Sequence, residues 1–132
     1  MNAQDLINRT HTVSITVDED DLAMAVGSGD LPVLATPRMA ALMEEAAAAL
    51  AAECLDDGIT TVGTKLCIIH TAPTLVGATV YAEATLSATD GRTFSFAVRA
   101  YDNVGDIGAG THDRVSVKSD RFLDKAASRA AQ

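Results

Sequence analysis

The stretch TPRMAALMEEAAAALAAECLDD, residues 36–57, decides the fold, because it is the longest run of strong helix formers in the chain. Pro37 is favoured at the first position of a helix, and the hydroxyl of Thr36 can cap the free amides of the first turn. No Gly or Pro follows until Gly58, so the sequence predicts a helix of about 20 residues. Its apolar stripe comprises Met39, Leu42, Met43, Ala46, Ala47 and Leu50. The many alanines in this helix indicate that it packs closely against a sheet.

Segments on both sides of this helix alternate between apolar and polar residues, which is the pattern of strands with one buried face. One such segment precedes the helix, at residues 10–17, and four follow it, at 60–71, 77–88, 92–102 and 107–120. The predicted inner faces are His11, Val13, Ile15 and Val17 in the first strand; Val62, Leu66, Ile68 and His70 in the second; Val80, Ala82, Ala84 and Leu86 in the third; and Phe94, Phe96, Val98 and Ala100 in the fourth. The order predicts an α+β fold in which one long helix covers an antiparallel sheet of about five strands.

The connections support this order. Asp90-Gly91 is a strong hairpin signal between the third and fourth strands. Residues 23–37 are rich in Gly, Pro and small side chains and predict a loop or lid. Residues 120–129 predict a short terminal helix. No repeat or linker interrupts the chain, so we expect a single domain over residues 1–132.

Composition excludes several classes of function. The chain has 132 residues, 48% of them hydrophobic, and a net charge of −8, which argues against a nucleic-acid partner and against binding to anionic membrane. Cys54 and Cys67 lack the spacing of a disulfide framework or a Cys-rich zinc site and are expected to be reduced, in apolar surroundings. There is no metal-binding motif, no apolar leader and no apolar run long enough to span a membrane, so a cytoplasmic protein without a metal is expected.

Three residues could carry chemistry on residue type and position alone. Glu44 lies within the long helix, His70 at the end of a strand and Thr36 at the helix start. A carboxylate and an imidazole in partly apolar surroundings can perform acid–base catalysis. The alternatives are a helix cap for Thr36, a solvated pair with its neighbour for Glu44 and a core histidine for His70. His11 and His112 carry no argument beyond a surface or strand position.

Three motifs resemble one known family. These are T-P-R-M-A-A-L-M-E (36–44), V-G-T-K-L-C-I-I-H-T-A-P (62–73) and D-I-G-A-G-T-H-D-R (106–114). Together they resemble the fluoroacetyl-CoA thioesterase family, a branch of the hotdog-fold thioesterases, over roughly residues 8–123. The resemblance implies a hotdog fold, with a long central helix wrapped by a curved antiparallel sheet, and a homodimer whose sheets join edge to edge.

The resemblance also implies an activity: hydrolysis of a small or medium acyl-CoA thioester to the free acid and CoA. Thr36, Glu44 and His70 match the catalytic positions of the family. Glu44 would attack the thioester or activate water, His70 would transfer the proton and Thr36 would orient the reacting groups. Gly63 and Arg114 match substrate-binding positions. No cofactor is implied, because CoA is part of the substrate.

Two further points follow from the comparison of motifs. Arg121 and Lys125 are candidates for contacts with the CoA phosphates. The lid segment GDLPVLAT (29–36) lacks the bulky aromatic residues of the fluoroacetate-selective member, so the acyl group is left open. The competing interpretation is a hotdog protein that binds acyl-CoA or another apolar ligand without turnover. Hydration of an enoyl-CoA is a third possibility, for which no dehydratase-type pattern is present.

Overall fold

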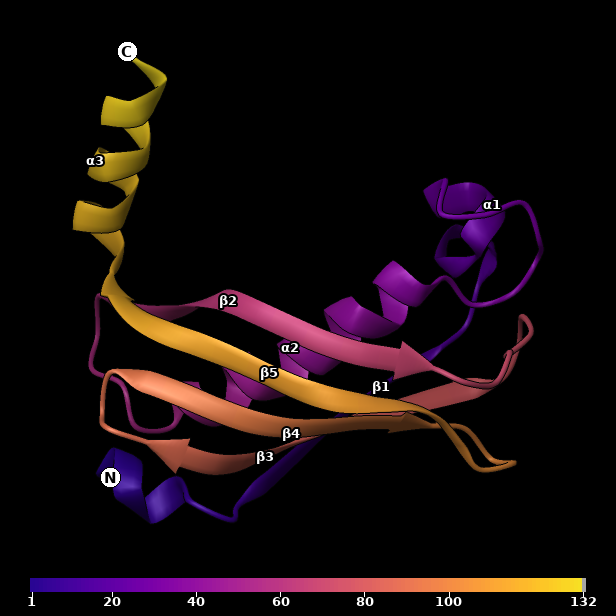
Figure 1. The fold of residues 1–132 in the computed structure, drawn as a ribbon, viewed down its shortest axis with the longest axis horizontal. Helices are drawn as coiled ribbons and strands as arrows, with labels where there is room; N and C mark the ends of the chain where they lie inside the picture. Colours follow the sequence, from indigo (N-terminus) through magenta and orange to yellow (C-terminus); the bar gives the residue numbers. More distant parts are fainter. Residues whose placement is uncertain (132) are drawn as a thin grey trace.

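Helix α2 (Thr36–Ala52) lies against one face of a five-stranded antiparallel sheet in the computed structural model of the protein (Figure 1). The structure describes residues 1–131, and Gln132, the last residue of the predicted domain, lies outside them. The strands are β1 (Thr10–Thr16), β2 (Ile59–His70), β3 (Thr79–Thr89), β4 (Thr93–Tyr101) and β5 (Asp106–Lys118). Their order in the sheet is β1-β3-β4-β5-β2, so β1 and β2 are the two edge strands. The predicted α+β architecture is confirmed.

The long helix buries the predicted stripe but begins differently from the prediction. All six apolar stripe residues are buried. The N-cap is Ala35, which has no side-chain cap, and Thr36 is already helical, so the prediction that Thr36 caps the helix is wrong. The helix also ends after 17 residues. The amides of Glu53 and Cys54 bond to carbonyl groups three residues back, which tightens the chain into a turn.

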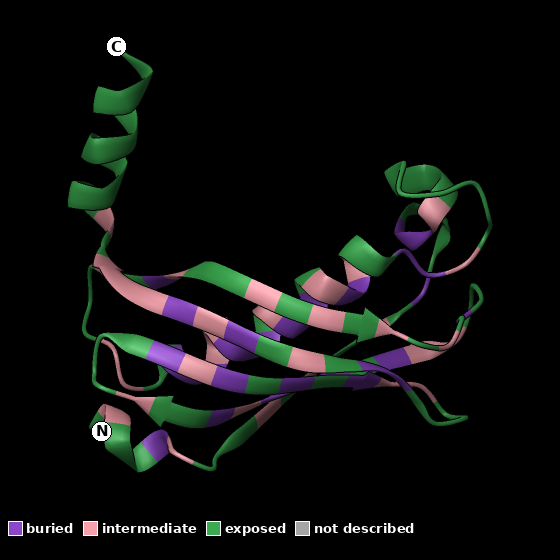
Figure 2. Ribbon diagram, viewed as in Figure 1, coloured by how far each residue is buried: buried purple, intermediate pink, exposed green. Residues whose placement is uncertain are grey.

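The strands next to the helix have the predicted inner faces. The predicted inner-face residues of β3 and β4 are all buried, and buried and exposed bands alternate visibly along the sheet (Figure 2). The inner face of β1 is partly buried, ending in the buried Val17. The core therefore forms between α2 and the inner face of the sheet.

Strand β2 departs from the predicted pattern because it contains a bulge. Its register with β5 shifts between Gly63 and Lys65. Val62 is paired with Val115, and Thr61 and Gly63 are on the side of the helix, so the prediction that Val62 shares a face with Leu66 is wrong. An inserted residue reverses which positions of the strand face the helix. The alternation of apolar and polar residues in the sequence carries no mark of that reversal. Cys67, on the outer face of this strand, is exposed rather than in apolar surroundings.

The remaining elements lie at the ends of the sheet. The 3-10 helices η1 (Ala3–Leu6) and η2 (Glu19–Asp21) flank β1, and the single-turn helix α1 (Ala23–Val26) follows. We call residues 19–35 the lid. Helix α3 (Ser119–Ala130), predicted from sequence, projects past the β2 edge at the opposite end of the sheet from α1 (Figure 1). No helix within residues 1–131 has the length and apolar character needed to cross a membrane.

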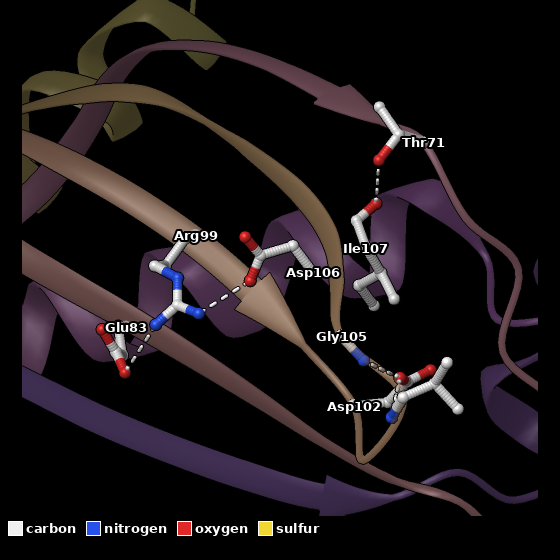
Figure 3. Close-up of polar contacts among 8 residues, drawn as sticks. Thr71, Glu83, Arg99, Asp102, Gly105, Asp106 and Ile107 are labelled. Carbon is white, nitrogen blue, oxygen red and sulfur yellow. Dashed lines mark hydrogen bonds and ion pairs between the residues drawn. The ribbon is translucent and has the colours of Figure 1, made fainter.

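A charged network on the outer face joins three strands (Figure 3). Arg99 in β4 donates to Glu83 in β3 at 3.1 Å and to Asp106 in β5 at 2.7 Å. Its guanidinium carbon lies 4.3 Å from the centre of the Tyr101 ring, which stacks on Tyr81. The hydrogen bond that Arg99 donates to Asp106 raises the pKa of Arg99, and burial offsets only part of this effect. Arg99 therefore keeps its positive charge near neutral pH.

Candidate active site

The start of α2 and the end of β2 bring Thr36 and His70 together. The hydroxyl oxygen of Thr36 lies 2.8 Å from Nδ1 of His70. Because Thr36 is the first helical residue and does not act as a cap, its hydroxyl is available for this contact. The other ring nitrogen of His70, Nε2, is buried and has no hydrogen-bond partner among the described residues. A buried polar atom of this kind is costly unless a ligand or a partner satisfies it.

A cavity of about 290 Å³ opens beside this pair, between the lid and the end of β2. Its remaining walls are small or apolar and come from Ala23, Ser28, Val33, Leu34, Thr71, Ala72 and Pro73. Burial lowers the pKa of His70, and an interaction with the backbone of Ala72 offsets only part of that effect. His70 is therefore a neutral imidazole near pH 7, in a form that can accept a proton.

The lid is fixed over this cavity by backbone and side-chain contacts. Leu34 donates to the carbonyl of Thr74, and Ala35 donates to the carbonyl of Asp21, each at 2.9 Å. Asp21 in turn accepts a 2.8 Å hydrogen bond from Nε of Arg38 on α2. Burial raises the pKa of Asp21, but hydrogen bonds from the Asp18 amide and from Arg38 outweigh it, so the pKa is lowered overall. The ion pair therefore ties the lid to the helix that carries the site.

Glu44 lies further along α2, over the bulge of β2. Its side chain is 43% exposed, and its Oε2 lies 3.7 Å from Nη1 of Arg114. A Cβ atom on Gly63 would come within 2.8 Å of the same oxygen, so only glycine leaves room for the carboxylate here. The carboxylate is accordingly held against the backbone of β2 while remaining accessible from outside.

Arg114 is buried beneath this carboxylate and its orientation is fixed. Its Nε and Nη2 donate to the hydroxyl and the carbonyl of Thr61, at 2.8 and 3.0 Å. Burial lowers the pKa of Arg114, and the charge of Glu44 raises it again in part. A guanidinium in such a setting stays charged near neutral pH, so it supplies a fixed positive charge 3.7 Å from the carboxylate.

His112 belongs to the same cluster, although no role was expected for it from the sequence. It is 1% exposed and donates through Nδ1 to the carbonyl of Lys65 at 2.7 Å. Nε2 is then the acceptor of the 3.2 Å contact from Nη1 of Arg114. The available signal was its spacing: His112 and Arg114 are two residues apart on β5 and therefore share a face.

The structure thus divides the predicted site residues into two groups. Thr36 and His70 form one pair, and Glu44, Gly63 and Arg114 form the other cluster. Thr36 and Glu44 are eight residues apart on α2, which separates their backbones by about 12 Å along the helix axis. No hydrogen bond or ion pair joins the two groups within residues 1–131. That part of the chain also contains no group of three or more His, Cys, Asp or Glu side chains placed to hold a metal ion.

The fold and this arrangement of polar residues define the class of hotdog-fold thioesterases. A hot-dog-like protein from Thermanaerovibrio acidaminovorans has the same fold, with a TM-score of 0.86, 20% identity and 98% and 97% coverage of the two chains. Within the class, the sequence model of the family described as fluoroacetyl-CoA-specific thioesterase matches residues 17–120. The chain belongs to this family, which confirms the resemblance seen in the sequence and the predicted hotdog fold.

Two relatives support the assignment. The fluoroacetyl-CoA thioesterase of Streptantibioticus cattleyicolor is 41% identical over 93 residues, which are 70% of this chain and 67% of that protein. A solved structure of the fluoroacetyl-CoA protein FlK, a threonine-to-serine variant in complex with acetyl-CoA, has 30% identity and a TM-score of 0.88. That match covers 93% of this chain and 97% of the other. The predicted enzyme class, a thioester hydrolase, is confirmed.

Proposed function

We propose that the protein hydrolyses the thioester of a small acyl-CoA to the free acid and CoA. The observation that carries this proposal is the accessible carboxylate of Glu44, held over Gly63 beside the buried charge of Arg114. A thioester carbonyl placed at this carboxylate would meet a base or nucleophile, as well as a positive charge close to where its oxygen becomes negative. A protein that only binds acyl-CoA has no need for such a group.

We further propose that two copies of the chain build each complete site. The pair Thr36–His70 lacks a carboxylate, and the cluster around Glu44 lacks an imidazole with a free nitrogen. Strand β2 is a 12-residue edge strand with an unpaired side, which a second copy can cover. Antiparallel pairing of two β2 strands would bring these half-sites together across the interface.

The bulge in β2 suggests one register for this pairing. If Cys67 lies opposite the partner's Cys67, then Leu66 lies opposite the partner's Ile68. Continuing outward, His70 comes to lie opposite the bulge that follows the partner's Gly63. Residues on the inner face then meet only residues on the inner face, as a continuous sheet requires. His70 would thereby approach the partner's Glu44.

Two chemical routes are compatible with such a site. In the first, Glu44 attacks the carbonyl carbon, the C–S bond breaks and an anhydride forms; His70 Nε2 then takes a proton from water, which attacks the anhydride. In the second, Glu44 takes a proton from water, the resulting hydroxide attacks the thioester carbonyl and the C–S bond breaks. In both routes the CoA thiolate takes up the proton removed from water, held by His70 in the first and by Glu44 in the second, and the acid is released. Thr36 holds the imidazole through Nδ1, and a backbone N–H beside Gly63 is the candidate donor to the oxyanion.

The acyl group that we propose is small, as the family to which the chain belongs suggests. The cavity beside His70 has a volume of about 290 Å³, and Val33 and Leu34 supply its lid wall. Fluoroacetyl-CoA, which the names of the relatives mention, would fit by size, but no aromatic side chain of the lid lines the cavity. We therefore propose short unsubstituted acyl groups as the preferred substrates.

A panel of acyl-CoAs tests the function. Free thiol release is measured with short, medium, aromatic and fluorinated acyl groups, for the wild type, Glu44→Ala and the control Glu45→Ala. Loss of the carboxylate at position 44 is expected to lower turnover by about 10²-fold or more, the scale of a lost general base, whereas Glu45 is exposed and its change should leave turnover intact. No release above that of Glu44→Ala across the panel would instead favour the binding protein.

The cellular location is proposed from the cysteines. Cys54 and Cys67 are both unpaired in the structure. Free thiols are typical of reducing compartments, so we propose that the protein works in the cytoplasm. The proposed steps use only side chains, backbone and water, with CoA as part of the substrate.

A further inference from the structure

A second and larger cavity lies between α3 and the adjoining ends of β2 and β5. Its volume is about 460 Å³. Four of its lining residues are cations, Arg92, Lys118, Arg121 and Lys125, and Ile59 and Phe122 supply apolar walls. Neither the hydrolytic chemistry nor the core of the fold requires a basic cavity at this place.

The positive charge of this cavity is not neutralised locally. None of the ion pairs formed among residues 1–131 involves any of its four cations. The nearby Asp90 is engaged by the amides of its own turn, and Asp120 and Asp124 on α3 do not line the cavity. In a chain with a net charge of −8, four unpaired cations around one cavity indicate a ligand with several negative charges.

The backbone holds these cations in place from different elements. Arg92 lies in the turn between β3 and β4, and its carbonyl accepts a 2.8 Å hydrogen bond from Ser116 of β5. Lys118 ends β5, and Arg121 and Lys125 are four residues apart on α3, so they lie on one face of that helix. The cavity therefore depends on α3 remaining where the structure places it.

The cavity and Glu44 are on the same side of the sheet. Ile59 is paired with Lys118 and Gly63 with Arg114, and positions 59, 61 and 63 of β2 share the helix-facing side. Four residues of strand separate Ile59 from Gly63, about 13 Å. The pantetheine arm of CoA has about a dozen backbone bonds, as many as four residues of extended chain, and so spans a similar distance of about 13 Å.

We infer that this cavity binds the 3′-phosphorylated ADP end of the CoA substrate, an inference that rests on the proposed function. That group carries about four negative charges on its phosphates, which matches the four cations in number. Phe122, which is 40% exposed, offers a flat apolar face on which the adenine ring can stack. A free nucleotide would share this chemistry, and the experiment distinguishes the two sources.

The test compares two substrates in one variant. Arg121→Gln/Lys125→Gln is assayed with acetyl-CoA and with the acetyl thioester of N-acetylcysteamine, which has no phosphates. The ratio of kcat/KM for acetyl-CoA to that for the short thioester is expected to fall about tenfold or more, mainly through KM, because charge-assisted contacts to phosphate are lost. The control Arg9→Gln/Arg129→Gln removes the same charge outside the cavity and should leave the ratio unchanged. An unchanged ratio in the cavity variant overturns the inference.

A direct binding measurement separates this inference from the proposed activity. Calorimetric titration with adenosine 3′,5′-bisphosphate is expected to show binding that weakens about tenfold or more in the cavity variant but not in the control. If no thioester is turned over while this binding depends on the cations, the activity fails and the phosphate subsite stands. ATP bound as tightly as the bisphosphate, together with an unchanged kinetic ratio, would identify a free-nucleotide site and overturn the inference.

Discussion

Gly63 decides how close the carboxylate of Glu44 can come to the backbone of β2. A side chain at this position would place its Cβ 2.8 Å from Oε2, with His112 and Arg114 at 3.2 and 3.4 Å. Gly63→Ala should therefore displace Glu44 and lower kcat about tenfold or more, because a carboxylate moved by about 1 Å loses its alignment with the thioester. Steady-state kinetics measure the effect.

The matched control for this substitution is Gly29→Ala. A Cβ at position 29 lies 3.5 Å from the Cβ of Ala23, an ordinary contact, so kcat should stay near that of the wild type. Equal kcat values for the two variants would show that the space over Gly63 is not needed for turnover.

We expect His70 to lower the free energy of unfolding of the protein as the pH falls below about 6.5. Burial lowers its pKa in the folded state, so below the ordinary histidine pKa of about 6.5 the unfolded chain binds the proton more readily. Its contribution to the free energy of unfolding is thus fully present above about pH 6.5 and is lost as the pH falls towards the lower, folded-state pKa. Urea denaturation of the wild type and His70→Asn at pH 5.5 and 7.5 measures this. A stability difference that is independent of pH would contradict the shift.

The residue types of the site could be predicted from the sequence, but their grouping could not. Three sequence motifs contain all five predicted site residues: Thr36, Glu44, Gly63, His70 and Arg114. Glu44 lies against Arg114 because β2 pairs with β5. His70 bonds to Thr36, 34 residues away, because β2 packs beside α2. Side chains that meet through such long-range pairing leave no mark on local periodicity.

At the scale of elements, the lid depends on its attachment to α2. Asp21 is 9% exposed and relies on Arg38 for a charged partner. Arg38→Ala should leave this carboxylate buried without its cation and raise its pKa. The free energy of unfolding should fall by about 1–2 kcal/mol, the cost of a buried group that loses a charged hydrogen bond.

Hydrogen exchange of the lid amides reports this change. Faster exchange over residues 22–34 is expected in Arg38→Ala, with the rest of the sheet unaffected. The control Arg9→Ala removes a 3.7 Å pair with Glu53 that is largely exposed and should change neither exchange nor stability measurably. Unchanged lid exchange in Arg38→Ala would show that the backbone contacts alone hold the lid.

Among the elements, the helices and strands with strong patterns were predictable and the irregular ones were not. The helix over residues 36–52 and the strands β3 and β4 follow from alternation and helix propensity. The bulge after Gly63 and the short helices of the lid follow from tertiary pairing, including the bridge between Leu22 and Leu34. Their local sequences, rich in Gly and small residues, permit these conformations without requiring them.

At the scale of the whole molecule, the proposed dimer places Cys67 on its two-fold axis. Directly opposed residues of an antiparallel pair have Cα atoms about 4.5–5.5 Å apart, within the range that a disulfide can bridge. Mild oxidation should therefore link two wild-type chains covalently, because Cys67 is exposed. Non-reducing electrophoresis measures the yield of linked dimer.

Two variants make this prediction specific. Cys67→Ser should abolish the linked dimer and Cys54→Ser should retain it, since Cys54 lies in the turn after α2 and not on the strand β2 of the proposed interface. Light scattering of the reduced protein at micromolar concentration should give the mass of two chains. A monomer in solution would contradict the dimer, and a dimer that Cys67 cannot link would contradict the register.

The 12 Å of helix between Thr36 and Glu44 has a consequence for how activity depends on the amount of protein. If each chain holds two halves of different sites, an isolated folded chain has no complete site and no activity. The rate of hydrolysis is then proportional to the concentration of dimer. Dilution below the dissociation constant of the dimer would then abolish the specific activity while the chains remain folded. In a cell, the rate of hydrolysis would rise with the square of the chain concentration as synthesis of the protein begins.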